Sequence, residues 1–246
     1  MIFLKQQNIL FIKPHKTAST SVEIALCCAS NDPADIITPL LPEDELKRAQ
    51  AGGAPPKNWA WLESTERRYL RDFAAYSQSG KIPRRALPGG KNKLYSKHSA
   101  RFYNHITPSA IKWRGGGVML RDAFIVSMVR HPYEQIVSWA WHQKKLHNID
   151  GLLSEIIDRG LTLPSPNIPY LFNKRPPDFV IRYETMADDL AKLSDRAGIK
   201  LGMHMLNAKG SYRSDRKSGS DMLTLAQKKV LYLRDQQIFE GYGYAP

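Results

Sequence analysis

The chain has 246 residues, of which 42% are hydrophobic and 24% are charged, and its formal net charge is +13. This size and composition are typical of one globular domain with a substantial core, so we expect a single domain over residues 1–246. No stretch approaches the roughly 20 apolar residues that a membrane span needs. Residues 1–5 are too short for the core of a signal peptide and lead straight into the first strand. We therefore expect a cytoplasmic protein with no membrane span.

The positive charge is concentrated in the middle of the chain. Between Phe73 and Arg121 there is no Asp or Glu, while Lys and Arg recur throughout. Such asymmetry favours a polyanionic partner: nucleic acid, an anionic polysaccharide, an anionic membrane surface or a highly phosphorylated cofactor. A basic face that only keeps the protein in solution is the alternative. The adjacent Cys27 and Cys28 cannot make a disulfide framework, and no histidine or cysteine has metal-ligand spacing, so we expect no metal site.

A possible anion-binding segment occurs near the start of the chain. Residues 8–12 are almost continuously apolar, as in a strand buried on both faces, and residues 22–26 resume the apolar pattern of a helix. Between them lies the run H-K-T-A-S-T-S, residues 15–21. The start of a helix has N–H groups without partners and a positive dipole, so the lysine and hydroxyls there predict a phosphate-sized cradle. The alternative is that Ser19 or Thr20 simply caps the helix.

Two long segments early in the chain separate this strand and helix from the rest. Residues 31–57 are rich in proline and glycine, and residues 77–97 are irregular and basic. We predict two irregular insertions there, with a short helix near residues 43–50 and a longer helix over 59–76 between them. Long irregular connections are often functional, so these insertions are expected to form walls of an acceptor site.

Further strands and helices alternate along the remaining sequence. Residues 122–130 and 178–183 are predicted strands, and Pro132 opens the helix after the first of them. The helix after the second is expected to stop near Gly198. The last helix opens at Thr224 with Gln227 three residues on, which is a capping-box pattern, and runs to about residue 239. This alternation predicts an α/β fold in three layers, with a central, mostly parallel sheet flanked by helices.

A second group of polar side chains follows the second of the predicted buried strands. Arg130 ends that strand, and Ser138 lies on the next helix. Because ligands of parallel α/β proteins bind beyond the carboxyl ends of the strands, these two residues are candidates for holding a second phosphate. The alternatives are that Arg130 is a structural ion-pair partner and that Ser138 is an ordinary helix residue.

Together the two groups resemble motifs of the sulfotransferases that use 3′-phosphoadenosine 5′-phosphosulfate (PAPS). The segment 16–21 resembles their 5′-phosphosulfate loop, and Arg130-x-Pro132 followed by Ser138 resembles their 3′-phosphate motif, in the same order along the chain. Residues 97–100, 179–190 and 235–244 resemble segments of the carbohydrate-type and bacterial branch. The chain departs from the family at His15, where proline is usual, and at Ala18–Ser19, where glycine is frequent.

The resemblance implies a P-loop-like fold and transfer of a sulfuryl group from PAPS to a hydroxyl or amine, leaving 3′-phosphoadenosine 5′-phosphate. The acceptor would be a small molecule or an oligosaccharide. Lys16 would be the catalytic cation, and the chain's cofactor-binding residues would be Lys16, Thr17, Ala18, Ser19, Thr20, Ser21, Arg130 and Ser138, with Arg216 and Lys217 in a late basic loop. His98 is the first candidate for the general base, since its ordinary pKa is near neutrality, and His105 and Glu184 are the alternatives.

Other functional classes are less well supported. A non-catalytic module could bind nucleic acid or an anionic glycan through residues 73–121, but no nucleic-acid-recognition motif is found, so we expect no nucleic-acid partner. A kinase of related fold would need a Walker A string, which is missing. The five tryptophans could stack on sugars or fill the core, and the sequence identifies neither the acceptor nor the oligomeric state.

Overall fold

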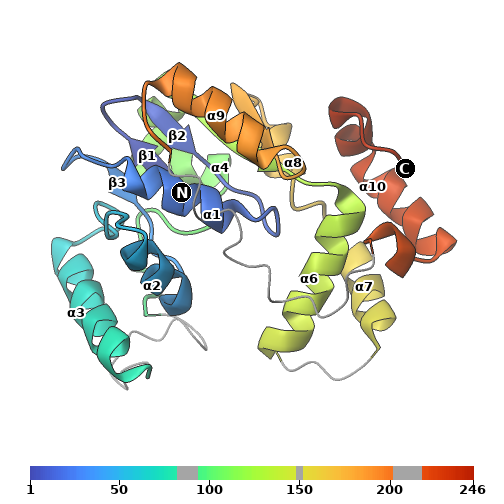
Figure 1. Ribbon diagram of the computed structural model, residues 1–246, viewed down its shortest axis with the longest axis horizontal. Helices are drawn as coiled ribbons and strands as arrows, with labels where there is room; N and C mark the ends of the chain where they lie inside the picture. Colours follow the sequence, from blue (N-terminus) through green and yellow to red (C-terminus); the bar gives the residue numbers. More distant parts are fainter. Residues whose placement is uncertain (82–93, 148–151, 202–217) are drawn as a thin grey trace.

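The computed structural model describes residues 1–81, 94–147, 152–201 and 218–246. Its centre is a five-stranded sheet in the order β3-β1-β2-β4-β5 (Figure 1). The strands are β1 (Ile2–Leu4), β2 (Ile9–Phe11), β3 (Ile36–Ile37), β4 (Phe124–Val129) and β5 (Phe179–Arg182). Strands β2, β4 and β5 are parallel neighbours, while β1 is antiparallel to both β2 and β3. The sheet is therefore mixed, with a parallel centre.

Alternating side chains of the strands enter two hydrophobic clusters, one on each face of the sheet. In β2, Ile9 and Phe11 belong to one cluster and Leu10 to the other, as the two-residue period of a strand requires. The first cluster includes residues of α1 (Ser19–Cys28) and α9 (Met186–Ala197). The second includes residues of α4 (Pro108–Ile111), α6 (Pro132–His147), α7 (Leu153–Leu161), α8 (Ile168–Leu171) and α10 (Leu225–Tyr242). Helices thus flank both faces, which confirms the expected α/β class.

The remaining helices lie around these layers. They are α2 (Pro42–Gln50), α3 (Glu63–Ser79), the π-helical turn η1 (Lys112–Gly116), α5 (Gly117–Asp122) and the short 3-10 helix η4 (Ser220–Met222). In Figure 1, α6, α7 and α10 gather on one side of the molecule, and α2 and α3 on the other. No helix among the described residues is both long enough and apolar enough to cross a membrane.

Local signals in the sequence agree with several helix boundaries. Helix α6 begins at Pro132, Gly198 ends α9 in the left-handed conformation, and Thr224 caps α10 by accepting a hydrogen bond from the Gln227 N–H. The reciprocal bond from the Thr224 N–H to the Gln227 side chain completes the predicted capping box. These ends depend on interactions within a few residues, which explains why the sequence predicts them well.

Three expectations need correction. Residues 1–5 do not simply lead into the first strand, because β1 folds back on β2 through the turn at residues 5–8. Residues 31–57 are not wholly irregular outside their predicted short helix, which is α2: residues 36–37 form β3, which pairs with β1. The helix expected over 59–76 lies at 63–79. Of the second predicted insertion, 77–97, residues 82–93 lie outside the described part of the chain.

Candidate functional site

The hydroxyl-rich loop connects the carboxyl end of β2 to the start of α1. Lys16 and Ala18 both have positive φ, 61° and 59°, although neither is glycine. Such alternation of left-handed residues turns successive N–H groups into an anion-binding concavity. Neither Ser19 nor Thr20 is the N-cap of α1, which is Ala18, and no side chain caps the helix. The Ser21 N–H donates to the Ala18 carbonyl oxygen at 3.1 Å, and the N–H groups before it in the loop keep the capacity to bind an anion.

The hydroxyl groups of the loop are directed inward. Thr17, Ser19, Thr20 and Ser21 are all buried. The Thr17 Oγ1 and Ser19 Oγ each lie 3.4 Å from the Pro14 carbonyl oxygen, to which they donate. The loop thus presents a compact concave backbone with Lys16, half-buried, beside it.

A buried ion pair fastens this loop to the helix that follows it. Lys13 and Glu23 form a fully buried ion pair, and the Met1 amino group lies 2.7 Å from the other Glu23 carboxylate oxygen. Burial alone would raise the pKa of Glu23, but Lys13, the Met1 ammonium and Arg48 outweigh it and lower the pKa to about 2. Glu23 is therefore ionised at neutral pH and ties the start of the loop to the second turn of α1.

Two histidines are stacked beside the loop. The rings of His15 and His105 have centroids 3.8 Å apart and planes 14° apart. The His105 Nδ1 lies 3.3 Å from the Lys13 carbonyl oxygen. Burial lowers the pKa of His105 well below its usual value, and the nearby Lys13 and His15 lower it further. Of the three base candidates named from the sequence, His105 is the one with contacts to this loop, and it is neutral at pH 7.

Helix α6 holds the loop from the other side. The Gln135 Nε2 donates to the His15 carbonyl oxygen at 2.6 Å. Gln135 and Asn167 are both buried and exchange two amide hydrogen bonds, of 3.0 Å and 2.6 Å, which fix the orientation of the Gln135 amide. Contacts from α1, from His105 and from α6 therefore position the loop.

The residues predicted to bind a second phosphate lie just before α6 and on it. Arg130 is largely buried, and its Nη2 lies 3.3 Å from the Glu134 Oε2. Its guanidinium stacks over the Tyr183 ring at 4.1 Å, and its buried Nε has no hydrogen-bond partner among the described residues. Ser138 lies one turn beyond Glu134 on the same stripe of α6, and is half-buried. The structural ion pair considered for Arg130 is therefore present.

The second oxygen of the Glu134 carboxylate forms a hydrogen bond with the backbone. Its Oε1 accepts a hydrogen bond from the Gly219 N–H. A Cβ at Gly219 would lie 2.8 Å from the Tyr133 carbonyl carbon and oxygen, so only glycine fits against the first turn of α6 here. Glu134 thus occupies the position beside Arg130 that an anion would take. Arg216 and Lys217, the remaining predicted cofactor contacts, lie outside the described residues.

The other two base candidates are placed differently from His105. The Glu184 Oε1 accepts from the His131 N–H at 2.9 Å, and its Oε2 accepts from the Tyr244 hydroxyl at 2.7 Å. Glu184 therefore joins the end of β5 to the start of α6 and to the end of the chain that follows α10. His98 is exposed, and the hydrogen bond recorded for it joins its backbone N–H to Ser96. Within the described residues, His98 forms no hydrogen bond or ring contact with the loop.

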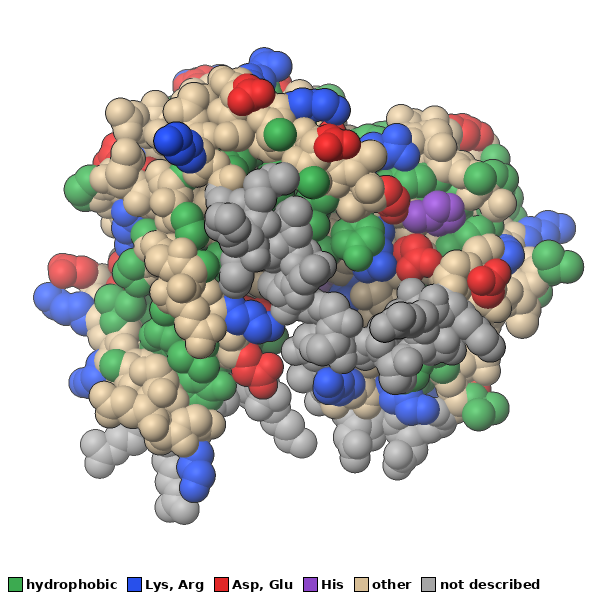
Figure 2. Space-filling model, viewed as in Figure 1, with side chains coloured by type: hydrophobic (Ala, Val, Ile, Leu, Met, Phe, Trp, Pro, Cys, Tyr) green, Lys and Arg blue, Asp and Glu red, His purple; other side chains and the backbone are tan. Residues whose placement is uncertain are grey.

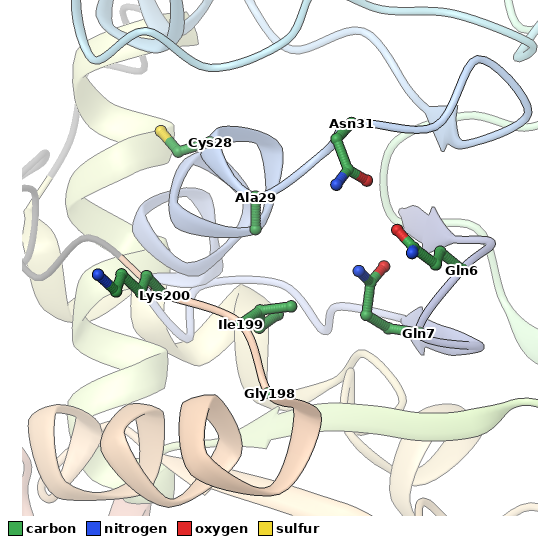
Figure 3. A pocket seen from close by; sticks show the side chains of 8 residues that line it. All are labelled: Gln6, Gln7, Cys28, Ala29, Asn31, Gly198, Ile199 and Lys200. Atoms are coloured by element: carbon green, nitrogen blue, oxygen red, sulfur yellow. The ribbon is translucent and has the colours of Figure 1, made fainter.

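Two cavities border the described core. One, of about 360 Å³, adjoins the loop; its lining residues are His15, Lys16, Gln135, Ile136, Trp139, His142, Gln143, Gly160, Leu163, Pro164, Pro166 and Arg234. The other, of about 390 Å³, lies at the opposite end of α1 and is lined by Gln6, Gln7, Cys28, Ala29, Asn31, Gly198, Ile199 and Lys200. In Figure 3 the side-chain amides of Gln6, Gln7 and Asn31 face this second space, while Cys28 lies apart from them.

Surface charge and metal ligands add little to the site. Figure 2 shows lysine and arginine side chains dispersed over one face, with acidic side chains between several of them. Among the described residues, no group of three His, Cys, Asp or Glu side chains is placed to hold a metal ion.

Comparisons with known proteins return no relatives. None of the family models, curated proteins or solved structures with which we compared the chain matches it. The function therefore has to be argued from the geometry of the site.

Several residues of the site were missed from the sequence. The Lys13–Glu23 pair and the Gln135–Asn167 pair join positions 10 and 32 residues apart, and no local pattern marks either. His15 belongs to the run that the sequence singles out, but nothing in the sequence indicates that its ring stacks on His105. Its place directly before Lys16 was the available signal that it belongs to the site.

Proposed function

We propose that the protein is a PAPS-dependent sulfotransferase that transfers a sulfuryl group to a hydroxyl or amine of an acceptor. One observation carries the proposal: β2 and β4 are parallel neighbours in the sheet, with Phe11 opposite Val126. The hydroxyl loop follows β2 and Arg130 follows β4, so two anion-binding groups lie at the same edge of the sheet. A nucleotide with phosphates at its 5′ and 3′ positions matches two such groups. The proposal includes a P-loop-like fold and a cytoplasmic location.

The residues of the loop have distinct roles in this reaction. The N–H groups at the start of α1, with the hydroxyls of Thr20 and Ser21, would bind the 5′-phosphate, while the hydroxyls of Thr17 and Ser19 donate to the Pro14 carbonyl oxygen. The acceptor oxygen or nitrogen forms a new bond to sulfur as the bond from sulfur to the bridging 5′-phosphate oxygen breaks. That oxygen keeps the electron pair, and Lys16 stabilises the charge that develops on it. Positioning of the two reactants supplies much of the remaining rate enhancement.

The acceptor proton must pass to a base near Lys16. The sequence favours His98, but the contacts around the loop favour the stacked pair of His15 and His105. His105 is neutral because of burial and the nearby cations, and His15 lines the cavity beside Lys16. A neutral imidazole is the form that accepts a proton. Because its lowered pKa makes His105 a weak base, we propose that His105 orients the His15 ring stacked on it and that His15 takes the acceptor proton, with His98 as the alternative base to compare.

The group after β4 would bind the 3′-phosphate. Arg130 has a buried Nε without a partner among the described residues, which leaves donor capacity for a phosphate oxygen. Its Nη2 faces Glu134, so a bound phosphate has to replace the carboxylate or share the guanidinium with it. The N–H groups of Arg130 fit a phosphate, and competition from the Glu134 carboxylate would determine the affinity for it.

The decisive experiment is a calorimetric titration of the protein with 3′-phosphoadenosine 5′-phosphate and, in parallel, with AMP. The proposal predicts that the bisphosphate binds and that AMP binds at least tenfold more weakly. Equal affinity for the two nucleotides, or no binding at millimolar concentration, would contradict it. Binding without discrimination that falls steeply with salt would favour a polyanion-binding module instead.

A pair of lysine variants tests the chemistry separately from binding. Lys16→Ala is expected to lower the rate of sulfuryl transfer from PAPS by about 10²–10³-fold, the usual effect of removing one group that stabilises transition-state charge. Lys16→Arg, which keeps the charge, is the matched control and should retain part of the activity. Full activity in Lys16→Ala would show that the site is assigned wrongly.

A further inference from the structure

An exposed surface outside the hydroxyl loop combines tryptophan side chains with lysine and arginine. It is formed by residues 59–62, 97–103 and 112–116, none of which is acidic, and we call it the basic aromatic surface. We propose that this surface binds the headgroup region of an anionic lipid bilayer, so that the protein attaches to the face of a membrane without crossing it. The inference is independent of the proposed function, because it uses neither the hydroxyl loop nor Arg130.

Backbone hydrogen bonds hold the first two segments of this surface together. The Trp61 N–H donates to the Ser99 carbonyl oxygen at 3.3 Å, and the Arg101 N–H donates to the Trp59 carbonyl oxygen at 2.8 Å. Trp59 is fully buried, whereas Trp61, two residues further on, is 53% exposed. One tryptophan of this segment therefore anchors it to the protein, and the other is accessible to a partner.

Arg101 joins the third segment to the first two. Its Nε and Nη2 donate to the carbonyl oxygens of Arg114 and Gly115 at 3.1 Å and 3.3 Å, and its guanidinium lies 5.9 Å from the centroid of the Trp61 ring. In return, the Arg114 Nη1 donates to the Ala100 carbonyl oxygen at 2.6 Å. These contacts fix the positions of the three segments relative to one another.

The π-helical turn η1 carries a second exposed tryptophan. Trp113 is 88% exposed, so it adds little to the core. Gly115 has a φ of 82°, and a Cβ there would lie 3.0 Å from the Arg101 Nη2, while a Cβ at Gly116 would lie 2.5 Å from the Ile111 Cγ2. The two glycines therefore allow the turn to pack this closely. Such π-helical turns occur frequently at functional sites.

The positive charge of this surface is not neutralised by nearby carboxylates. Its four cations are Lys97, Arg101, Lys112 and Arg114. The last three form no ion pair with a carboxylate among the described residues. The first acidic residues of α3 are engaged elsewhere: Glu63 lies 3.2 Å from Arg67, and the Glu66 carboxylate accepts hydrogen bonds from the N–H groups of residues 58–60. Charge complementarity therefore favours an anionic partner.

The apolar members of the surface distinguish between classes of anionic partner. Trp61 is followed by Leu62, which is 65% exposed. Tryptophan is enriched where a bilayer meets water, and lysine and arginine beside it are attracted to anionic headgroups. A single-stranded nucleic acid would stack on the tryptophans, but an exposed leucine has no part in such stacking. A lipid surface accommodates the leucine, the tryptophans and the cations together.

The test measures co-sedimentation of the full-length protein with large unilamellar vesicles. Vesicles of phosphatidylcholine alone are compared with vesicles that also contain about 30% phosphatidylserine, each at low and at high salt. We expect the anionic vesicles to bind the protein at low salt and the neutral vesicles to bind it at least about tenfold more weakly, since several cations contribute. High salt should weaken binding to the anionic vesicles by screening the charges.

Variants of the surface locate the contact. Lys112→Gln should weaken binding to the anionic vesicles about fivefold, the effect of removing one cation near the membrane. Trp113→Ala should weaken it by at least about fivefold, through the loss of buried apolar area, and should reduce quenching of the protein's fluorescence by brominated lipid. Lys229→Gln and Leu225→Ala, at exposed positions on α10, are the matched controls and should bind normally.

Several outcomes would overturn the proposal. They are the absence of binding to the anionic vesicles, equal binding to both kinds of vesicle, and binding that is unchanged in both surface variants. Tighter binding of a single-stranded oligonucleotide or of heparin than of the vesicles would also overturn it, because the surface would then serve another polyanion. The variants should keep the thermal unfolding temperature of the wild type and its affinity for 3′-phosphoadenosine 5′-phosphate, so failure here leaves the proposed function standing.

Discussion

The imidazole rings of His15 and His105 are stacked in contact, with centroids 3.8 Å apart. Protonation of either ring would place a charge against the other ring and near Lys13. Burial and these neighbours lower the pKa of His105 well below its usual value. His105 therefore stays neutral beside the loop, and this has a consequence for stability at acid pH.

Stability should fall as the pH drops below about 6.5, the ordinary pKa of histidine. Below that pH the unfolded chain protonates His105 while the folded protein keeps it neutral, so the free energy of unfolding decreases, by up to ~1.4 kcal/mol per pH unit for one proton. Above that pH, His105 is neutral in both the folded and the unfolded chain, so its titration does not change the free energy of unfolding. Urea unfolding between pH 8 and pH 5 measures this.

The histidine responsible can be identified with two variants. His105→Asn removes the titrating ring and suits the positive φ of 57° at this position. It should reduce the pH dependence, leaving the part due to the Met1 amino group, whose pKa burial lowers to about 6. His98→Asn, at an exposed position, is the matched control. An identical pH profile in His105→Asn and the wild type would contradict the assignment.

The buried pair of Lys13 and Glu23 should be essential to the loop. Glu23→Gln removes the carboxylate facing a fully buried ammonium, and breaking one partner of a buried pair usually costs 3–5 kcal/mol. In the wild type, Glu23 stabilises the fold above pH 4.5, and this contribution is lost as the pH falls toward its folded pKa of about 2. Chemical denaturation measures both effects.

A double variant separates charge from packing in the same pair. Lys13→Met combined with Glu23→Leu removes the charges of Lys13 and Glu23 but leaves the buried Met1 amino group without its carboxylate partner. It should therefore restore only part of the stability lost in Glu23→Gln, although hydrophobic replacement of an isolated buried pair is often neutral. If Glu23→Gln were as stable as the wild type, the pair would not hold the loop as described.

Arg130 and Glu134 should have opposite effects on nucleotide affinity. Arg130→Ala is expected to weaken binding of 3′-phosphoadenosine 5′-phosphate by about 10–100-fold, since a hydrogen bond to a charged group contributes ~1.5–3 kcal/mol. Glu134→Gln removes the carboxylate that now faces the guanidinium and should strengthen binding. Isothermal calorimetry measures both.

AMP is the control ligand for these two variants, because it lacks the 3′-phosphate. Neither substitution should change AMP affinity by more than about twofold. Weaker bisphosphate binding in Glu134→Gln would mean that Glu134 positions Arg130 for the phosphate and does not compete with it. That result would overturn the competition described above.

Glu184 should act on stability and not on the chemical step. It accepts hydrogen bonds from the His131 N–H and the Tyr244 hydroxyl. Glu184→Ala should therefore lower the free energy of unfolding by about 1–3 kcal/mol while kcat at a permissive temperature stays within twofold. Tyr244→Phe is the matched variant and should show a smaller loss. A general base would instead lose about 10²–10⁴-fold in rate.

The sequence predicted best what short stretches determine. The parallel strands, the start of α6 at Pro132 and the capping box at Thr224 each follow from a few neighbouring residues. It predicted poorly what depends on distant partners. Residues 36–37 form a strand because β1 offers them an edge, and β1 itself could not be recognised from three apolar residues at the chain start.

The candidate site was predicted in the same uneven way. The lysine and hydroxyl loop and Arg130 lie at the expected edge of the sheet. The carboxylate beside Arg130 could have been anticipated, since Glu134 is four residues further on and such pairs meet on a helix. His105 lies 90 residues after His15 in the sequence. Its contact with the loop therefore depends on tertiary packing, which no periodic pattern in the sequence indicates.

Helix α6 presents Glu134 and Ser138 on one stripe, and Gln135 and Trp139 on the neighbouring one. A displacement of α6 at either stripe would also be transmitted to the other. The nucleotide and the acceptor should therefore alter each other's affinity by the same factor, because such linkage is reciprocal.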